Sequence, residues 1–281
     1  LFIDYLFQFE KLAFDSSTQN VAGVEAIISD CNYLQGKIKY YDREKKKEVT
    51  LNKTYAEAIL EAGKKNNISP YHIASRIRQE QGTGAGSEIS SGTWGKYDGK
   101  YKGYYNYFNI RATGETEDEI IKNALEYAKK QGWTDPVKAI EGGAKFIAED
   151  YIECGQDTLY LQKYDVDDSD GSLYICQYMT NIAAPKNEAE SIREAYRRMG
   201  LLDKNSSFTF KIPVYKEMPE ERAPLPGDSK LVTQNIEITE NNVTVRKGKG
   251  TNYSIVTTLN KGKSETLLQN EIKNVTSYID I

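Results

Sequence analysis

The chain has a single histidine, His72, and only three cysteines, Cys31, Cys154 and Cys176, spread far apart along 281 residues. A zinc site needs several such ligands at close spacing, and a Ser-His-Asp apparatus needs a suitably placed histidine. An odd number of distant cysteines also gives no disulfide framework. We therefore expect no metal and no cofactor, and a chemistry carried by carboxylates, tyrosines, amides and water.

Long apolar runs and an excess of basic charge are also missing. No stretch approaches the roughly 20 apolar residues of a membrane-spanning helix, so we expect no membrane span. The 37 basic and 41 acidic residues are interspersed and give a net charge of −4. Nucleic acid is usually bound by a basic face, so we expect no nucleic-acid partner, and we expect a monomer.

The pattern of apolar residues changes along the chain and predicts one large domain followed by a small one. Helical spacing dominates residues 1–217. Within this range Ser69 and Pro70 have the positions of an N-cap and a first helical residue, and Gly82 is predicted to end the same helix. The charged stretch YDREKKKEVT (41–50) is predicted to be a surface loop. Residues 218–231, rich in proline and charge, predict a linker, and residues 232–281 alternate as short strands.

Tyrosine is unusually frequent, with 21 Tyr against 8 Phe. Seven aromatic residues fall within residues 94–108, inside a Gly- and Ser-rich segment (83–110) that has no helical period. Tyrosine suits wet grooves, because its ring packs while its hydroxyl forms hydrogen bonds. We predict that this segment is an irregular or β lobe over a cleft in a mainly α domain.

Glu80 occupies a position on a predicted helix face that is otherwise lined by apolar side chains. Residues three, four and seven apart share a helix face, so Glu80 follows Ile73 and Ile77 near the helix end. Burial and the negative end of the helix dipole both disfavour an ionised carboxylate there. The expected raised pKa suits a general acid. The alternative is a surface ion pair with Arg76, four residues earlier.

Three blocks of the sequence carry a resemblance to a known family. They are TYAEAILEAGKKNNISPYHIASRIRQEQG (54–82), YYNYFNIRATG (104–114) and QYMTNIAAPKNEAESI (177–192). In this order they resemble the bacterial endo-β-N-acetylglucosaminidases of glycoside hydrolase family 73, autolysins with a lysozyme-like fold. The resemblance covers about residues 54–200. It implies that Glu80 is the catalytic acid, that Tyr178 lies next to the scissile sugar and that Asn109 forms part of the cleft floor.

The resemblance also implies a substrate and a location. It indicates a secreted or wall-associated hydrolase of a Gram-positive bacterium that acts on peptidoglycan glycan strands. The bond would be the β-1,4 link between N-acetylglucosamine and N-acetylmuramic acid. The alternatives are a muramidase or lytic transglycosylase on the same fold, or a non-catalytic wall-binding protein.

The sequence leaves more than one candidate for the second catalytic group. Two carboxyl groups lie about 5–5.5 Å apart in retaining glycosidases and about 6.5–9.5 Å apart in inverting ones. Glu88 is the nearest acidic candidate by position, in the lobe after Glu80. The acetamido group of the substrate is another, since its carbonyl can attack the anomeric carbon. In that case Tyr178 could orient this group or stabilise the developing charge.

The substrate-binding candidates are aromatic rings and amides, because rings stack on sugar faces and amides bind hydroxyl or acetamido groups. They are Trp94, Tyr104, Tyr105, Tyr107, Phe108, Asn109, Gln177 and Asn181. Met179 and Ile182 are expected in the core. Arg111 and Cys176 depart from what the family is expected to carry, and we expect Cys176 to be a small buried hydrophobe rather than a catalytic thiol.

The tail VTVRKGKGTNYSIVTTLNKG resembles the opening strands of a bacterial SH3-like domain. That resemblance covers only about 50 residues, so we expect an incomplete domain at residues 232–281. Its implied role is wall binding or positioning, and the alternative is a generic β-hairpin module.

Overall fold

The computed structural model describes residues 6–167, 173–174, 177–178, 181–202, 207–217, 233–237, 241–246, 254–262, 264–268 and 278–279. The chain divides into two compact units, Leu1–Pro213 and Val214–Ile281. Backbone hydrogen bonds join the N-terminal and C-terminal segments of the first unit: Lys11 N donates to Thr209 O (2.8 Å) and Lys211 N donates to Phe9 O (2.8 Å). The predicted linker, residues 218–231, lies outside the described residues.

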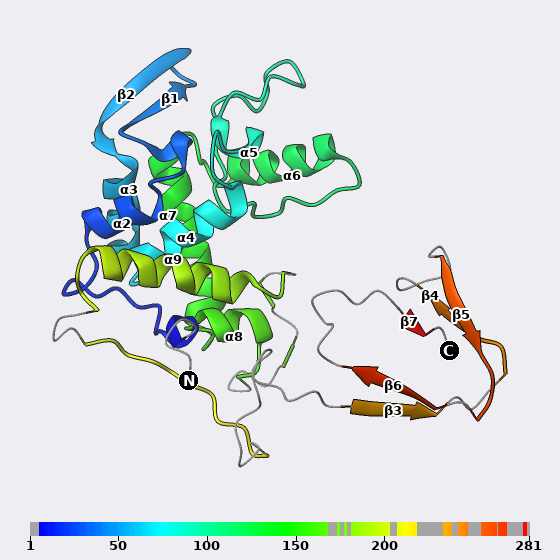
Figure 1. Cartoon of the computed structure of the whole chain (residues 1–281). Coiled ribbons are helices and arrows are strands. Elements are labelled where there is room, and N and C mark those ends of the chain that lie inside the picture. The colour runs from blue at the N-terminus through cyan, green and yellow to red at the C-terminus, as the bar shows by residue number, and fades with distance from the viewer. Residues whose placement is uncertain are drawn as a thin grey trace. The chain divides into compact units, whose positions relative to one another are not determined.

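The first unit is mainly helical, as predicted (Figure 1). Its α-helices are α2 (Val21–Ile27), α3 (Tyr55–Lys65), α4 (Pro70–Gln81), α5 (Glu88–Ser91), α6 (Glu117–Lys130), α7 (Pro136–Ile147), α8 (Leu159–Tyr164) and α9 (Ala184–Arg198). The 3-10 turns are η1 (Phe7–Phe9) and η2 (Asn32–Leu34), and a π-helical turn, η3 (Ala148–Ile152), directly continues α7. Helices α2, α3 and α9 pack against α4, and α7 packs against α3.

Helix α4 begins and ends where the sequence predicts. The Ser69 side chain accepts a hydrogen bond from His72 N (3.3 Å), and Pro70 occupies the first turn. At the other end Gly82 has φ 73°, a conformation that favours glycine and stops the helix. Helix α3 begins with a capping box between Thr54 and Glu57. The signals at the two ends of α4 place Glu80 in the last turn of this helix.

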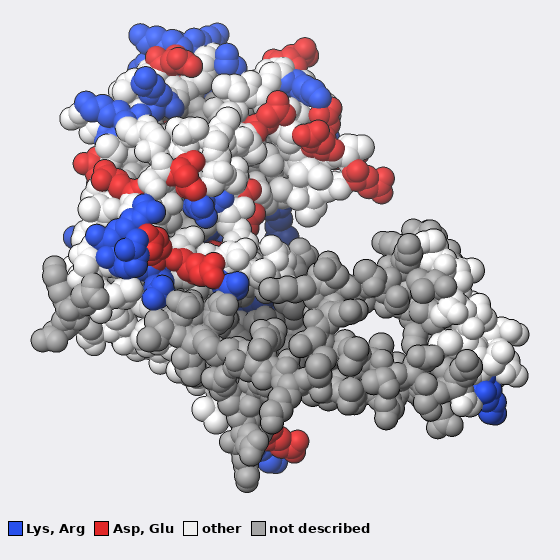
Figure 2. Space-filling model, in the orientation of Figure 1, with Lys and Arg blue, Asp and Glu red and all other residues white. Residues whose placement is uncertain are grey.

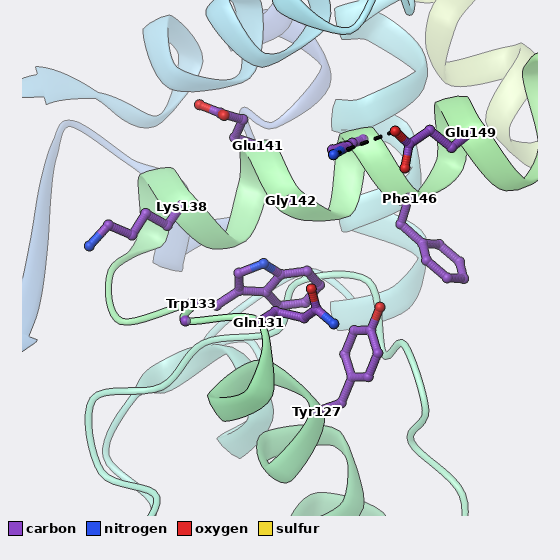
Figure 3. Close-up of a pocket in the computed structure, with 10 residues that line it drawn as sticks. Tyr127, Gln131, Trp133, Lys138, Glu141, Gly142, Phe146 and Glu149 are labelled. Atoms are coloured by element: carbon purple, nitrogen blue, oxygen red, sulfur yellow. Dashed lines mark ion pairs between the residues drawn. The ribbon is translucent and has the colours of Figure 1, made fainter.

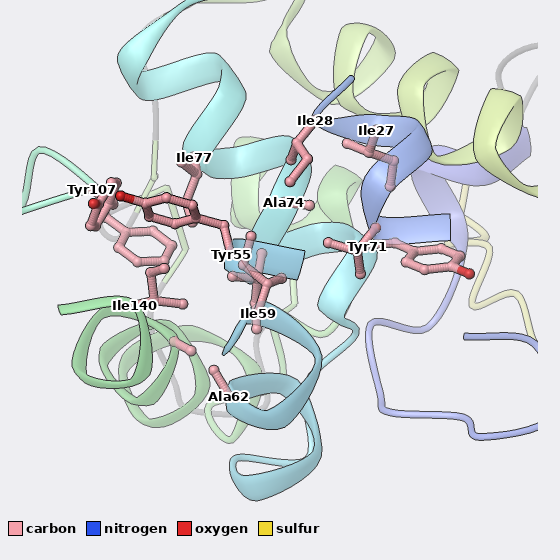
Figure 4. Packing of buried hydrophobic residues seen from close by; sticks show 14 of the residues in the cluster. Ile27, Ile28, Tyr55, Ile59, Ala62, Tyr71, Ala74, Ile77, Tyr107 and Ile140 are labelled. Atoms are coloured by element: carbon pink, nitrogen blue, oxygen red, sulfur yellow. The ribbon is translucent and has the colours of Figure 1, made fainter. Parts of the chain in front are cut away.

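The core surrounds α4 on almost every side. Tyr71, Ile73, Ala74 and Ile77 are all 0% exposed. Figure 4 shows several of these side chains together with residues of α3 and α7. Because α4 is enclosed down to its last turn, a carboxylate at its C-terminal end must lie at the edge of this core.

Residues 41–50 form part of a β-hairpin, so the prediction of a surface loop is wrong there. Strand β1 (Lys37–Asp42) pairs antiparallel with β2 (Lys47–Thr54). The Asp42 carboxylate accepts hydrogen bonds from Glu44 N (3.0 Å) and Lys45 N (2.9 Å), which closes the turn between the strands. Because the segment is so rich in charge, its strand pattern was missed. In this pattern Val49 and Leu51 are partly buried and their neighbours are exposed.

The segment 83–116 forms an irregular lobe that shares a small core with α6. Ile89, Trp94, Tyr101, Ile121, Ala124 and Leu125 pack together there. Buried Asn106 fixes the following turn, because its amide donates to Ile110 O (2.9 Å) and Ala124 O (3.2 Å) while its carbonyl accepts from Phe108 N (3.3 Å) and Ile110 N (3.2 Å). This network sets the position of Asn109.

Among its described residues, the second unit contains strands and connecting turns and no helix. Strand β3 (Thr233–Glu237) pairs with β6 (Ser264–Leu268), and β4 (Val243–Arg246) pairs with β5 (Ile255–Leu259) and β7 (Tyr278–Ile279), all antiparallel. The predicted β character of the tail is confirmed at these strands. Its assignment as an SH3-like domain stays a prediction.

Basic and acidic side chains are mixed over the visible surface of the first unit (Figure 2). Among the described residues, no helix has both the length and the apolar character needed to cross a membrane.

Candidate active site

Glu80 lines an open pocket of about 380 Å³ in the first unit. The pocket is lined by the end of α4, the turn after the lobe aromatics, α7 with η3, and the segment before α9. Its lining residues are Glu80, Phe108, Asn109, Ile110, Arg111, Thr113, Phe146, Asp150, Tyr151 and Tyr178. Sequence segments as distant as residues 80 and 178 therefore meet at one site.

The Glu80 carboxyl is half-buried, and burial raises its pKa above the ordinary value. The negative charge of Glu188 acts in the same direction. The positive charge of Arg76 and a hydrogen bond from the Asn109 amide (3.2 Å to Glu80 Oε2) oppose the rise. The net direction confirms the raised pKa expected from the sequence, and it favours a protonated carboxyl that can act as an acid.

Asn109 is held firmly beside this carboxyl. Its amide also donates to the backbone carbonyl of Glu80 (2.8 Å), and its side-chain carbonyl accepts from Gln81 Nε2 (2.8 Å). The backbone of Asn109 has φ 51°, in the left-handed region that asparagine tolerates better than most residues. The position of the Asn109 amide is therefore determined by α4 itself.

Arg76 forms its ion pair with Glu188 of α9 rather than with Glu80. The Arg76 Nε to Glu188 Oε1 distance is 2.8 Å, and His72 Nδ1 lies 3.3 Å from Glu188 Oε2. Arg76 NH2 also donates to Gln162 Oε1 (3.0 Å). These side chains of Arg76, His72 and Glu188 are at most 1% exposed, so the alternative of a surface pair between Arg76 and Glu80 is wrong.

Tyr178 covers the outer side of this buried network. The Arg76 guanidinium lies 3.7 Å from the centroid of the Tyr178 ring. Tyr178 N donates to Gln162 O (2.9 Å), and the ring meets Tyr151 edge-on at 4.9 Å between centroids. Burial raises the pKa of the Tyr178 hydroxyl, so it remains a neutral hydrogen-bond donor across the ordinary pH range.

Four of the predicted site residues meet in this pocket: Glu80, Phe108, Asn109 and Tyr178. Gln177, next to Tyr178, is exposed. Asn181 lines a different hollow, of about 300 Å³, together with Arg78, Gln79 and Ser191. Ile182 is 75% exposed, so its assignment to the core is wrong. Cys176 and Met179 lie outside the described residues.

The remaining predicted residues lie elsewhere in the lobe. Trp94 packs in the small lobe core, and Tyr107 is buried with its hydroxyl next to that of Tyr55. The hydroxyl of Tyr105 accepts a hydrogen bond from Tyr41 N (2.8 Å), and the Tyr104 ring lies under the Arg43 guanidinium at 4.2 Å. These rings pack the lobe and join it to the β-hairpin, so the density of aromatics there reflects packing more than sugar contact.

Glu88 is the exposed first residue of α5 and does not line the Glu80 pocket. The other carboxylate that does line it is Asp150, which sequence reasoning missed. Asp150 and Tyr151 belong to the π-helical turn η3, a rare element that often occurs at functional sites. No local signal distinguishes Asp150 from the neighbouring acidic residues Glu149 and Glu153 in the sequence.

Among the described residues, no group of three or more His, Cys, Asp or Glu side chains is arranged to hold a metal ion. The site therefore offers one carboxyl with a raised pKa, a fixed amide, a neutral phenol and a second carboxylate in an open pocket. These groups suit acid catalysis on a neutral, hydroxyl-rich substrate.

No family model matches the chain. Similar curated proteins include the bifunctional autolysin of Staphylococcus epidermidis (strain ATCC 12228 / FDA PCI 1200), which is 30% identical over 159 residues, or 57% of this chain and 11% of that protein. The bifunctional autolysin of Staphylococcus aureus (strain MSSA476) is 34% identical over 113 residues, or 40% of this chain and 8% of that protein. The chain thus spans only about a tenth of the length of these relatives.

The solved structure of S. aureus Autolysin E is also similar. It aligns with a TM-score of 0.50 and 25% identity, over 71% of this chain and 75% of that one. Sequence and fold together confirm the resemblance to bacterial autolysins that the three sequence blocks indicate. The comparisons leave the tail, residues 232–281, as a prediction.

Proposed function

We propose that this chain is a peptidoglycan hydrolase, an endo-β-N-acetylglucosaminidase that cleaves the β-1,4 bond between N-acetylglucosamine and N-acetylmuramic acid. The observation that carries the proposal is the Glu80 carboxyl. It is half-buried, its pKa is raised, and it opens into a pocket lined by Asn109 and Tyr178. The likeness to autolysins supports the choice of peptidoglycan as substrate.

In the proposed reaction Glu80 donates its proton to the glycosidic oxygen as the bond from that oxygen to the anomeric carbon breaks. The Asn109 amide keeps the carboxyl directed into the pocket. Water supplies the hydroxyl that ends on the anomeric carbon, and its remaining proton restores the acid. The product has N-acetylglucosamine at its new reducing end.

The developing positive charge on the sugar needs a partner, and the pocket offers two routes. The 2-acetamido carbonyl of the substrate can attack the anomeric carbon, with the neutral Tyr178 hydroxyl donating a hydrogen bond nearby. Alternatively Asp150, which lines the same pocket, can stabilise the charge or activate water. Glu88 has a weaker claim, because it lies outside the lining of this pocket.

The proposed partner is the glycan strand of a Gram-positive cell wall, so the protein would act as a secreted or wall-associated monomer. In this proposal the strand-rich tail serves wall binding or positioning, and the helical unit carries the chemistry. The autolysin relatives support action on the cell wall.

The test is a digest of purified peptidoglycan by the wild-type chain, by Glu80→Gln and by a matched control, Glu61→Gln, which removes an exposed carboxylate from α3. Products are reduced with borohydride and the terminal sugar is read by mass spectrometry. We expect reduced N-acetylglucosamine from wild type and control. Loss of the acid should lower the rate by about 10²–10⁴-fold.

Other outcomes of the digest would favour one of the alternative functions. Reduced N-acetylmuramic acid would indicate a muramidase, and its anhydro form a lytic transglycosylase. Binding to cell walls without clearing in a zymogram would indicate a wall-binding protein. Full activity in a folded Glu80→Gln would remove Glu80 from the mechanism.

A further inference from the structure

A further hollow, of about 340 Å³, lies at the junction of α6 and α7 (Figure 3). Tyr127 comes from the last turns of α6, Gln131 and Trp133 follow that helix, and Phe146 comes from α7. In Figure 3 Tyr127 and Phe146 extend toward the same side of the hollow from their two helices. Neither the catalytic proposal nor the sequence motifs account for this hollow.

The hollow adjoins the Glu80 pocket, because Phe146 lines both. A row of rings connects them: Tyr178 contacts Tyr151 at 4.9 Å, and Tyr151 contacts Phe146 at 6.3 Å between centroids. The charges of Arg111 and Asp150, which line the Glu80 pocket, also act on the pKa of the Tyr127 hydroxyl. A chain bound at Glu80 can therefore continue past Phe146 to Tyr127.

The floor of the hollow depends on one glycine. Trp133 is buried, meets the Tyr127 ring edge-on at 5.4 Å, and packs against Gly142 of α7. A Cβ atom at Gly142 would lie 2.1 Å from Trp133 Nε1. The bare backbone at this position thus lets the indole lie against the helix and keeps the hollow open above it.

The charges that line the hollow are balanced. Glu149 pairs with Lys145 at 3.5 Å, Lys138 pairs with Asp135 at 3.2 Å, and Glu141 pairs with Lys65. These pairs leave no excess of one sign to attract a charged ligand. What remains for a ligand is two half-buried rings and the exposed Gln131 amide, a combination that suits a neutral sugar with apolar faces and polar edges.

We propose that this hollow binds the sugar residues of the glycan strand that extend beyond the pair at Glu80, with the Tyr127 ring as the stacking surface and Gln131 as the hydrogen-bonding group. The proposal rests on the proposed function for the identity of the ligand. It assigns to the chain a preference for strands longer than a disaccharide.

The experiment measures binding rather than cleavage, so that the two proposals can fail separately. Calorimetry gives the affinities of a disaccharide and of a hexasaccharide of alternating N-acetylglucosamine and N-acetylmuramic acid for Glu80→Gln, which should not consume them. The same titrations are made with Tyr127→Ala, Tyr127→Phe and Gln131→Ala added to that background. The quantity compared is the ratio of the two affinities.

We expect Tyr127→Ala to lower this ratio by about tenfold, or about 1.4 kcal/mol. Tyr127→Phe keeps the ring and should leave it unchanged. Gln131→Ala, at an exposed position, should lower it by about threefold, and it decides the question if Tyr127→Ala does not fold.

An unchanged ratio in folded Tyr127→Ala and in Gln131→Ala would overturn the proposal. A loss seen only with strands that carry stem peptides would overturn it as well, in favour of a peptide site. If the wild type fails to cut peptidoglycan while the ratio still falls, the proposed function fails and the glycan-binding hollow stands.

Discussion

The guanidinium of Arg76 lies 3.7 Å beneath the ring of Tyr178, and Arg76 is itself fully buried. A desolvated cation against an aromatic face stabilises the contact by about 2 kcal/mol. Glu188 balances the cation from the opposite helix at 2.8 Å. The tyrosine of the proposed active site is therefore supported by a charge pair inside the core.

Removing Glu188 should be severely destabilising. In Glu188→Ala the buried Arg76 keeps its charge but loses its counter-ion, and breaking a buried pair in this way costs about 3–5 kcal/mol. The measurement is the free energy of unfolding in urea. Glu190→Ala is the matched control, because Glu190 is an exposed residue of the same helix paired with Lys186 at 3.6 Å. A change of no more than about 0.5 kcal/mol is expected there. Equal effects from the two substitutions would contradict this account of the pair.

Glu80→Gln should make the folded protein more stable while lowering its activity by about 10²–10⁴-fold. The folded-state pKa of Glu80 is raised, so its contribution to stability is present at low pH and is lost as the pH rises through that pKa. The stability gain of the variant should thus be largest at about pH 8 and should vanish near about pH 4. Urea unfolding of both proteins at the two pH values measures it. A gain that is the same at both would mean that the carboxyl is not desolvated.

The same direction of shift predicts the pH profile of cleavage. The rate should fall as the pH rises through the Glu80 pKa, because the acid must carry its proton when the bond breaks. This is the alkaline limb of the same titration that the stability measurement follows. If the chain has the proposed activity, the two transitions should therefore coincide in the ligand-free protein.

The second carboxylate can be identified by comparing two conservative variants. Asp150 lines the pocket and Glu88 does not, so Asp150→Asn should lower kcat/KM by about tenfold or more while Glu88→Gln changes it less than about twofold. Rates on purified peptidoglycan decide between them. The reverse order would restore Glu88 as the partner. Full activity in both variants would favour attack by the substrate acetamido group.

Glu10, which does not line the Glu80 pocket, should make the free energy of unfolding depend on pH. Its carboxyl is buried and accepts a hydrogen bond from the Tyr196 hydroxyl (2.6 Å), and burial raises its pKa to about 8. The stabilising contribution is complete below the ordinary pKa of 4.5 and is lost as the pH rises to about 8. Each pKa unit is worth about 1.4 kcal/mol, so the loss is on the order of 5 kcal/mol. Urea unfolding between these pH values should show a slope that Glu10→Gln reduces; an unchanged slope would mean that Glu10 is not the source.

Several parts of the fold and site could be predicted because they depend on local signals. Ser69, Pro70 and Gly82 define α4 through capping, a fixed φ and a left-handed stop, all of which act within a few residues. The raised pKa of Glu80 followed from helical spacing, which predicts burial, and from the position of Glu80 at the negative end of the helix dipole. Tyr178 and Asn109 needed the family resemblance, because nothing local brings residues 80, 109 and 178 together.

The parts that could not be predicted depend on tertiary contacts. The charges at residues 41–50 indicated a loop, whereas pairing with β1 decides the structure there. Trp94 and Tyr107 look like sugar-binding residues by composition, yet Trp94 packs in the small core of the lobe and Tyr107 packs in the main core. Asp150 enters the pocket only because α7 ends in a π-helical turn, and no sequence rule used above detects such a turn.

Gln81 follows the acid directly and ends α4. Its amide nitrogen contacts Tyr107 O (3.1 Å), Asn106 O (3.4 Å) and Asn109 Oδ1 (2.8 Å), so one side chain fastens the lobe to the helix. Moving the lobe away from α4 would break these hydrogen bonds of Gln81. The same movement would separate the Asn109 amide from the Glu80 carboxyl that it orients. In the proposed mechanism, a bound glycan strand that holds the lobe in place would therefore keep this carboxyl oriented.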